Sequence, residues 1–287
     1  MSRLEEALRR AQAWPETSAA PVTIPAARDE YWPADPEKEK QAPAIDAPPD
    51  NALPALLTKG NERLITFPKA EQSIVEQYRK LAATLHHAQA ERELKVVMVS
   101  SAVSGDGKTL TAINLALTLS ESYRRRVLLI DADLRRPSVH TVFELKNETG
   151  LTDSLTAATE RRLPLIQATP NLSLLLAGRP DSDPMSGLTS GRMRRLITEA
   201  AANFDWVIID TPPLVLLPDA NLLAAMVDAA ILVIGAGKTP YKLITRAIEA
   251  VGRSRILGVV LNRVDHMYVA GGYGYAYGYN YFTPRPK

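Results

Sequence analysis

A glycine-rich stretch that ends in Lys-Thr carries the clearest chemical signal in the sequence. The run S-G-D-G-K-T at 104–109 follows an apolar, β-branched segment at 95–101 and precedes an apolar-periodic stretch that continues to Leu119. In a strand, loop and helix of this kind, backbone N–H groups surround a phosphate group. Lys108 would bridge the β- and γ-phosphates of a nucleotide, and the Thr109 hydroxyl would bind Mg²⁺. The predicted nucleotide-binding residues are Ser104, Gly105, Asp106, Gly107, Lys108, Thr109 and Leu110.

Carboxylates stand at the ends of two further apolar runs. R-V-L-L-I-D-A-D at 126–133 ends in Asp131 and Asp133, and W-V-I-I-D at 206–210 ends in Asp210. Open α/β sheets bind their ligands at the carboxyl ends of strands. Any one of these aspartates could instead cap a turn or a helix. Beside a phosphate loop, the three together predict a magnesium site.

Phenol hydroxyls gather near the C-terminus. Six of the ten tyrosines lie between positions 268 and 281, spaced among glycines that have no side chain to pack. By composition alone, this segment could equally be a low-complexity tail without chemistry. Because the same chain also carries a phosphate-binding motif, the segment is better interpreted as a flexible substrate. The predicted phosphoacceptors are Tyr268, Tyr273, Tyr275, Tyr277, Tyr279 and Tyr281.

The elements that would position these residues alternate along the chain. Apolar runs predict strands near 95–100, 126–131, 172–177, 206–210, 229–235 and 257–261, with helical patterns between them. This alternation predicts an α/β fold, a three-layer P-loop sandwich around a mainly parallel sheet. Residues 1–14 form a short amphipathic helix pattern, 15–71 a Pro- and Ala-rich linker expected to be largely disordered, 72–266 the catalytic domain, and 267–287 the tyrosine-rich tail.

Composition favours a soluble cytoplasmic enzyme. The chain has 287 residues, 46% of them hydrophobic, which is enough for one large core. No apolar run approaches the roughly 20 residues of a membrane helix, and residues 1–14 are too charged for a signal peptide. Cysteine is absent, and the net charge of +2 predicts no nucleic-acid surface.

These motifs resemble those of the bacterial tyrosine kinases of capsule and exopolysaccharide loci, a branch of the P-loop ATPases related to ParA and MinD. The phosphate loop resembles the Walker A motif, although Ala102 replaces its usual first glycine. The run D-A-D-L-R at 131–135 resembles Walker A-prime. The run V-I-I-D-T-P-P at 207–213 resembles Walker B. The resemblance implies ATP and Mg²⁺ as cofactors. It implies catalytic roles for Lys108, Asp131 and Asp133, with Asp131 preferred as the base, metal binding by Thr109, Asp131 and Asp210, and an adenine contact by Asn262.

One family motif is incomplete. The helix before the first strand carries E-x-x-R-x-x-R in the family and is used for subunit contact in a ring. This chain keeps Glu76 and Arg79 but has Ala82 at the second arginine. A homo-oligomer is therefore expected, with ring formation open. The alternative is an amphipathic packing helix with Val75, Leu81 and Leu85 facing inward.

The resemblance also implies a biological role. It predicts autophosphorylation of the tail in trans, regulation of polysaccharide polymerisation and export, and recruitment to the inner face of the plasma membrane. The implied partners are the cytoplasmic segment of a transmembrane chain-length regulator, as activator, and a cognate tyrosine phosphatase. One alternative is a MinD- or ParA-like positioning ATPase, although that group has a lysine where this chain has Val103. The other is a non-catalytic, nucleotide-dependent switch.

Overall fold

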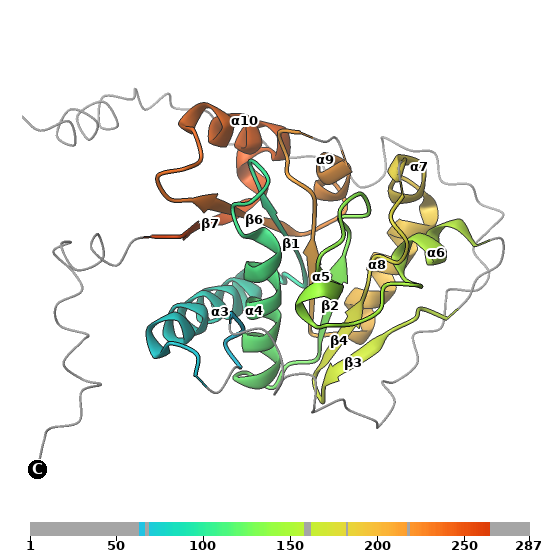
Figure 1. Ribbon diagram of the computed structural model, residues 1–287, viewed down its shortest axis with the longest axis horizontal. Helices are drawn as coiled ribbons and strands as arrows, with labels where there is room; N and C mark the ends of the chain where they lie inside the picture. The colour runs from blue at the N-terminus through green and yellow to red at the C-terminus, as the bar shows by residue number, and fades with distance from the viewer. Residues whose placement is uncertain (1–62, 67–68, 158–161, 182, 217–218, 265–287) are drawn as a thin grey trace, which may run out of the picture. The chain divides into compact units, whose positions relative to one another are not determined.

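The computed structural model describes residues 63–66, 69–157, 162–181, 183–216 and 219–264 (Figure 1). The predicted N-terminal helix at 1–14, most of the predicted linker, and the tyrosine-rich tail at 267–287 lie outside these residues. Three parts of the sequence-based domain division therefore stay predictions. The described residues belong almost entirely to the predicted catalytic domain at 72–266.

A seven-stranded sheet forms the centre of this domain (Figure 1). Its strands lie in the order β3-β4-β2-β5-β1-β6-β7, and all neighbours are parallel except β3 and β4. The strands are β1 (Val96–Ser101), β2 (Val127–Asp131), β3 (Ile166–Thr169), β4 (Leu172–Leu175), β5 (Trp206–Asp210), β6 (Ala229–Gly235) and β7 (Ile256–Asn262). The mainly parallel α/β prediction is confirmed. Six of the seven strands were expected from the sequence, and β3 was missed.

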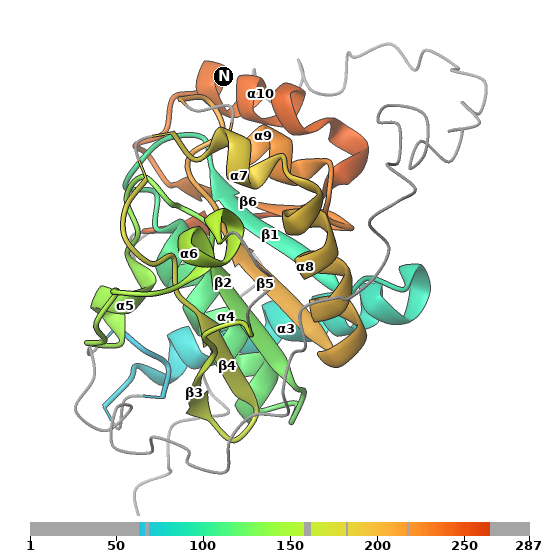
Figure 2. The same cartoon turned by 90° about the vertical axis from the view of Figure 1, so that its right-hand side faces the viewer.

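Helices cover both faces of the sheet (Figure 2). Each central strand is buried along its whole length, because its alternate side chains enter two separate apolar cores. Helices α3 and α4 supply one core, and α8, α9 and α10 supply the other. The helices are α3 (Gln72–Arg92), α4 (Lys108–Glu121), α5 (Val139–Val142), α6 (Leu151–Thr156), α7 (Met185–Leu188), α8 (Gly191–Asn203), α9 (Asp219–Ala224) and α10 (Tyr241–Val251), with a 3₁₀ turn at Arg253–Arg255.

The strand order brings the predicted chemistry together at one edge of the sheet. β5 lies between β1 and β2, and both of its pairings are parallel. The loop after β1 and the carboxylates that end β2 and β5 therefore emerge side by side. In the β2–β5 ladder, Asp131 lies directly opposite Asp210.

A short segment before α3 packs onto the domain. Leu64 is buried in the core beneath α3 and α4. The Asn114 side chain accepts a hydrogen bond from the backbone N–H of Ile65 and donates one to the carbonyl of Arg63, each at 3.1 Å. Residues 63–66 were assigned to the linker from composition. The structure instead ties them to α4, the helix that begins at the phosphate loop.

The buried face of α3 differs from the amphipathic alternative, which placed Val75, Leu81 and Leu85 inward. Leu85 is buried as expected, but the other fully buried positions are Ala82 and Ala88, whereas Val75 and Leu81 are only half-buried. Ala82 has no exposed surface. The position of the second arginine of the family motif is therefore a core position in this chain.

No helix among the described residues is both long enough and apolar enough to cross a membrane.

Candidate functional site

The loop between β1 and α4 has the backbone shape of a phosphate cradle. Gly105 and Gly107 both adopt positive φ angles, +87° and +98°. Other residues rarely adopt these angles, so the glycine spacing has a conformational cause. A Cβ on Gly107 would lie 2.0 Å from Asn262 Nδ2, whereas one on Gly105 would meet nothing within 4 Å. The loop therefore needs glycine at 107 for space as well as for φ.

The predicted loop residues lie in different environments. Ser104 and Gly105 are exposed, while the Leu110 side chain packs against the core beneath α4. The Asp106 side chain is buried. The surface that the loop presents to a ligand therefore consists mainly of backbone, as phosphate binding requires.

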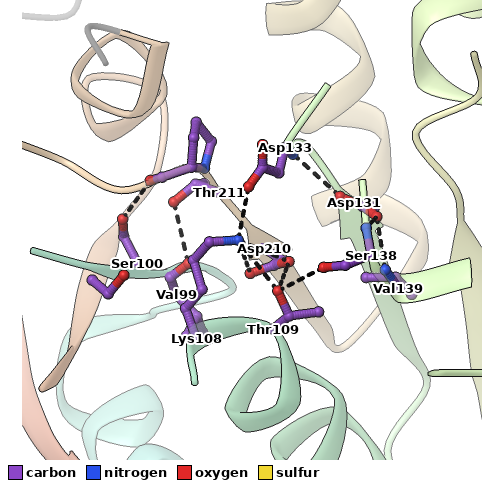
Figure 3. A network of polar contacts seen from close by, with 12 residues as sticks. Val99, Ser100, Lys108, Thr109, Asp131, Asp133, Ser138, Val139, Asp210 and Thr211 are labelled. Carbon is purple, nitrogen blue, oxygen red and sulfur yellow. Dashed lines mark hydrogen bonds and ion pairs between the residues drawn. The ribbon is translucent and has the colours of Figure 1, made fainter. Parts of the chain in front are cut away.

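Lys108 stands at the centre of the site (Figure 3). Its Nζ lies 2.9 Å from Asp133 Oδ2 and 3.5 Å from each carboxylate oxygen of Asp210. All three side chains are nearly inaccessible, with exposed fractions of 11%, 7% and 0%. The structure thus joins the phosphate-loop lysine to two of the predicted aspartates, from β2 and β5.

Thr109 extends the same network. Its hydroxyl donates to Asp210 Oδ2 at 2.7 Å and accepts from Ser138 Oγ at 3.0 Å (Figure 3). Ser138 precedes α5, and its backbone N–H donates to Asp131. The segment after β2 is therefore connected to the first turn of α4 through two hydroxyl groups.

Asp131 is held by backbone N–H groups. Its Oδ2 accepts from Ser138 and Val139 at 3.1 and 3.0 Å, and its Oδ1 accepts from Asp133 at 3.2 Å. The side chain is completely buried. The Asp131 carboxylate thus accepts hydrogen bonds from the backbone at the start of α5. The assignment of Asp131 as general base stays a prediction. A substrate hydroxyl would have to approach Oδ1, which accepts one hydrogen bond, whereas Oδ2 accepts two.

Burial and crowded charges shift the ionisation of these groups. Burial, reinforced by the neighbouring Asp210 carboxylate, raises the pKa of Asp131 to about 7. Burial also raises the pKa of Asp210. Burial opposes the charged form of Lys108, but the nearby Asp210 and Asp133 outweigh it and raise the lysine pKa. The site thus favours a charged lysine and opposes ionisation of the Asp131 and Asp210 carboxyl groups.

The donor atoms at the site fit a nucleotide-bound Mg²⁺ rather than a metal held by protein alone. Among the described residues, no group of three or more His, Cys, Asp or Glu side chains is arranged to hold a metal ion. The oxygens that do meet are those of Thr109 and Asp210, with Ser138 behind them. Mg²⁺ keeps several waters and phosphate oxygens and takes only one or two protein ligands. The predicted metal set of Thr109, Asp131 and Asp210 stays a prediction.

Asn262 lies beside the phosphate loop. Its Nδ2 donates to the backbone carbonyl of Asp106 at 2.8 Å, and its Oδ1 accepts from the backbone N–H of Arg263. Both ends of the amide are therefore engaged with the protein in this structure. The predicted adenine contact of Asn262 stays a prediction.

The predicted subunit-contact residues lie away from this network. Glu76 and Arg79 pair with each other on the surface of α3, with Oε1 and Nη1 2.6 Å apart. The predicted phosphoacceptor tyrosines lie outside the described residues.

Two further polar contacts at the site were missed from the sequence. Ser138 contacts Thr109 and precedes α5. Serine is a preferred residue immediately before a helix, so the sequence could have indicated a helix start here. Arg135, the last residue of the D-A-D-L-R run at 131–135, forms a two-point ion pair with Asp219 at 2.6 and 3.3 Å. Their separation in sequence hides that pairing.

Comparison with known proteins agrees with this geometry. Residues 97–269 match the CobQ/CobB/MinD/ParA nucleotide-binding domain. The tyrosine-protein kinase YwqD of Bacillus subtilis is 40% identical over 202 residues, which are 69% of this chain and 84% of that protein. The chain belongs to the bacterial tyrosine kinase family.

Two solved structures are similar to this chain. The kinase domain of the Escherichia coli tyrosine kinase ETK matches with a TM-score of 0.61 and 30% identity, over 67% of this chain and 77% of that one. The chimerical protein CapA2B2 matches with a TM-score of 0.65 and 25% identity, over 71% and 91%. The predictions of a tyrosine kinase and of a P-loop fold are confirmed, and a positioning ATPase is not favoured.

Proposed function

We propose that this kinase transfers the γ-phosphoryl group of ATP, with Mg²⁺, to the tail tyrosines of a neighbouring copy. The observation that carries the proposal is the convergence of Lys108, Thr109, Asp133 and Asp210 beside the glycine loop. A lysine, a hydroxyl and two carboxylates beside a backbone cradle are the groups that phosphoryl transfer uses.

Most of the catalytic contribution is electrostatic. Phosphoryl transfer passes through a loose transition state, so the protein mainly positions the reactants and neutralises charge. Lys108 would move its hydrogen bonds from Asp133 to the β- and γ-phosphates, and loop N–H groups would bind the β-phosphate. Mg²⁺, when bound, would neutralise charge between these phosphates, held by Thr109 and, through water, by Asp210.

The nucleophile needs a proton acceptor. A tyrosine hydroxyl has a pKa of about 10, so at neutral pH it must lose its proton as it attacks. We assign this role to Asp131, which ends β2 directly opposite Asp210. Release of Lys108 to the nucleotide would leave Asp133 available to orient the incoming phenol.

The tail is the proposed substrate. Residues 267–287 follow β7, whose end touches the phosphate loop through Asn262. An extended chain covers about 3.3 Å per residue, so the tail can reach a neighbouring subunit. Each phosphotyrosine adds about −1.5 to −2 charges, so modified tails would repel one another. We propose that this repulsion separates subunits and that a phosphatase resets the cycle.

The proposed setting is the cytoplasmic face of the plasma membrane. The kinase would be activated there by the cytoplasmic segment of a transmembrane chain-length regulator, and the cycle would control capsular or exopolysaccharide polymerisation and export. The support for this setting is the membership of the chain in the bacterial tyrosine kinase family. Glu76 and Arg79 would contribute to contacts between copies.

The test is direct. The purified chain is incubated with ATP and Mg²⁺, alone and with a candidate activator segment, and phosphate is mapped by mass spectrometry. Phosphate should appear on Tyr268, Tyr273, Tyr275, Tyr277, Tyr279 or Tyr281. Lys108→Met should abolish it, whereas Lys242→Met, which removes an exposed lysine from α10, should not. ATP hydrolysis without phosphotyrosine would contradict the proposal and favour a switch ATPase.

A mixing experiment tests the trans arrangement. A tail-deleted chain with an intact site is mixed with the full-length Lys108→Met variant, so that active site and substrate reside on different molecules. Phosphate on the Lys108→Met chain supports transfer between copies. Its absence, when the intact wild type does phosphorylate itself, would contradict it.

A further inference from the structure

Asp106 places a carboxylate in the loop that is proposed to bind phosphate. The loop at 104–109 must bind the negatively charged phosphates of a nucleotide, yet Asp106 brings a carboxylate into the middle of it. A negative charge close to a bound phosphate opposes binding, and the opposition grows where water is excluded. The direction in which this side chain points therefore matters for the site.

The structure turns the Asp106 carboxylate away from the cradle. The side chain is only 3% exposed, and its Oδ1 accepts a hydrogen bond from Thr239 Oγ1 at 2.7 Å. Thr239 lies in the turn between β6 and α10, and its hydroxyl in turn accepts from the backbone N–H of Gly235 at 3.2 Å. The carboxylate thus rests against the end of β6.

The space for this carboxylate is provided by a glycine. A Cβ on Gly235 would lie 2.9 Å from Asp106 Oδ1 and 3.4 Å from Thr239 Oγ1. On the other side, Asn262 holds the backbone carbonyl of Asp106 at 2.8 Å. Residue 106 is therefore held through its side chain by the end of β6 and through its backbone by the end of β7.

One oxygen of the carboxylate has no compensating contact. Asp106 Oδ2 is buried and has no hydrogen-bond partner among the residues that the structure describes. The hydrogen bond from Thr239 to Oδ1 therefore holds the charge in this pocket. Without it, the carboxylate would gain by turning toward solvent, and the open side of the loop is the phosphate side.

We propose that Thr239 is a positioning residue for nucleotide binding, which holds the Asp106 charge away from the phosphates. This inference rests on the proposed nucleotide site. The role of Thr239 is tied to the charge of its partner, since a neutral side chain at 106 would not repel a phosphate wherever it pointed. If Thr239 only supported the loop structure, its replacement would weaken nucleotide binding equally with a charged or a neutral side chain at position 106.

Four full-length variants test the inference: Thr239→Val, which keeps the shape but removes the donor, Thr239→Ser, which keeps the donor, Asp106→Asn, which removes the charge, and the double variant Thr239→Val with Asp106→Asn. Affinities for fluorescent ATP and ADP analogues are measured with Mg²⁺ by titration, and thermal unfolding checks that each variant is folded.

We expect Thr239→Val to bind both analogues about tenfold more weakly, the smallest loss typical for a hydrogen bond to a charged group. Thr239→Ser should stay within about threefold of the wild type, since the donor is retained. In the Asp106→Asn background, Thr239→Val should change affinity by less than about twofold, because no charge remains to be held. The loss in Thr239→Val should also shrink at high salt, which screens the repulsion.

An equal loss from Thr239→Val in both backgrounds would overturn the inference and leave Thr239 as a structural residue. So would unchanged affinity in the single variant. A wild-type chain that binds neither analogue would instead refute the proposed nucleotide site itself, so the two failures are distinguishable.

Discussion

Replacing Asp133 by asparagine tests how the site behaves before nucleotide binds. Lys108 Nζ lies 2.9 Å from Asp133 Oδ2, and both side chains are nearly inaccessible. Removing one partner of a buried ion pair costs about 3–5 kcal/mol when the other charge is left alone. Here Asp210 remains 3.5 Å from the ammonium group. We therefore expect a smaller loss from Asp133→Asn, about 2–3 kcal/mol of unfolding free energy.

The same change should strengthen nucleotide binding. In the wild type, a phosphate group must take Lys108 from Asp133, so part of the binding free energy is spent on breaking the ion pair. In Asp133→Asn the lysine is already free of that partner. We expect about tenfold tighter binding of ADP and ATP, equivalent to about 1.4 kcal/mol. Phosphoryl transfer should nevertheless fall, because Asp133 is a predicted catalytic residue.

Thermal unfolding with and without Mg-ATP measures both effects. Each kcal/mol corresponds to roughly 2–4 °C in a domain of this size, so the nucleotide-free variant should melt about 4–12 °C lower. Saturating Mg-ATP should raise the melting temperature of Asp133→Asn by more than it raises that of the wild type. Asp183→Asn, an exposed aspartate in the segment before α7, is the matched control and should change neither quantity.

Unchanged stability together with unchanged nucleotide affinity would refute the reasoning, since it would mean that the ion pair does not compete with phosphate in solution. Lower stability with weaker nucleotide binding would also contradict it, because Asp133 would then support the cradle rather than occupy its lysine.

Three further predictions concern single positions. Gly107→Ala places a Cβ 2.0 Å from Asn262 Nδ2 at a φ of +98°. Nucleotide titration should therefore find an affinity about tenfold lower than that of the wild type, and an unchanged affinity would contradict this. Burial raises the pKa of Asp131 from 3.8 to about 7, so the folded protein binds the proton more tightly, and the free energy of unfolding should fall as pH rises between these values. The stability of Asp131→Asn relative to the wild type should therefore rise with pH across that window, by up to about 4 kcal/mol, and denaturant titrations that find a pH-independent difference would exclude this. Asp219→Asn weakens the ion pair with Arg135 and should lower the melting temperature by about 4–8 °C, for a loss of about 2 kcal/mol, while an unchanged melting temperature would show that the pair contributes nothing.

Local sequence patterns were sufficient for the phosphate loop and for most of the sheet. The strand, glycine loop and helix at 95–119 follow from residue types within about 25 positions, and the positive φ angles of Gly105 and Gly107 agree with that pattern. β3 was missed because it is four residues long and its pairing depends on β4, which follows after a two-residue turn. The Pro170-Asn171 pair in that turn was an unused signal.

The packing of two segments was not foreseen from the sequence patterns. Residues 63–66 follow a proline-rich stretch and look like linker, yet Leu64 is buried and Asn114 holds the backbone on either side of it. On α3, the small Ala82 and Ala88 are buried while larger apolar residues are only half-buried. Burial in both places depends on the shape of α4 and the neighbouring core, which a hydrophobicity pattern does not contain.

The sequence alone determined the chemical class of this protein: a phosphate loop with its lysine and threonine, two acidic strand ends, and a tyrosine-rich tail after the last strand. These signals are local, because each needs only a few residues at fixed spacing. Only the tertiary structure decided which groups touch: Lys108 with Asp133, Thr109 with Ser138, and Asp106 with Thr239. These contacts join residues up to 133 positions apart, and their geometry is set by the strand order of the sheet and by packing on both of its faces.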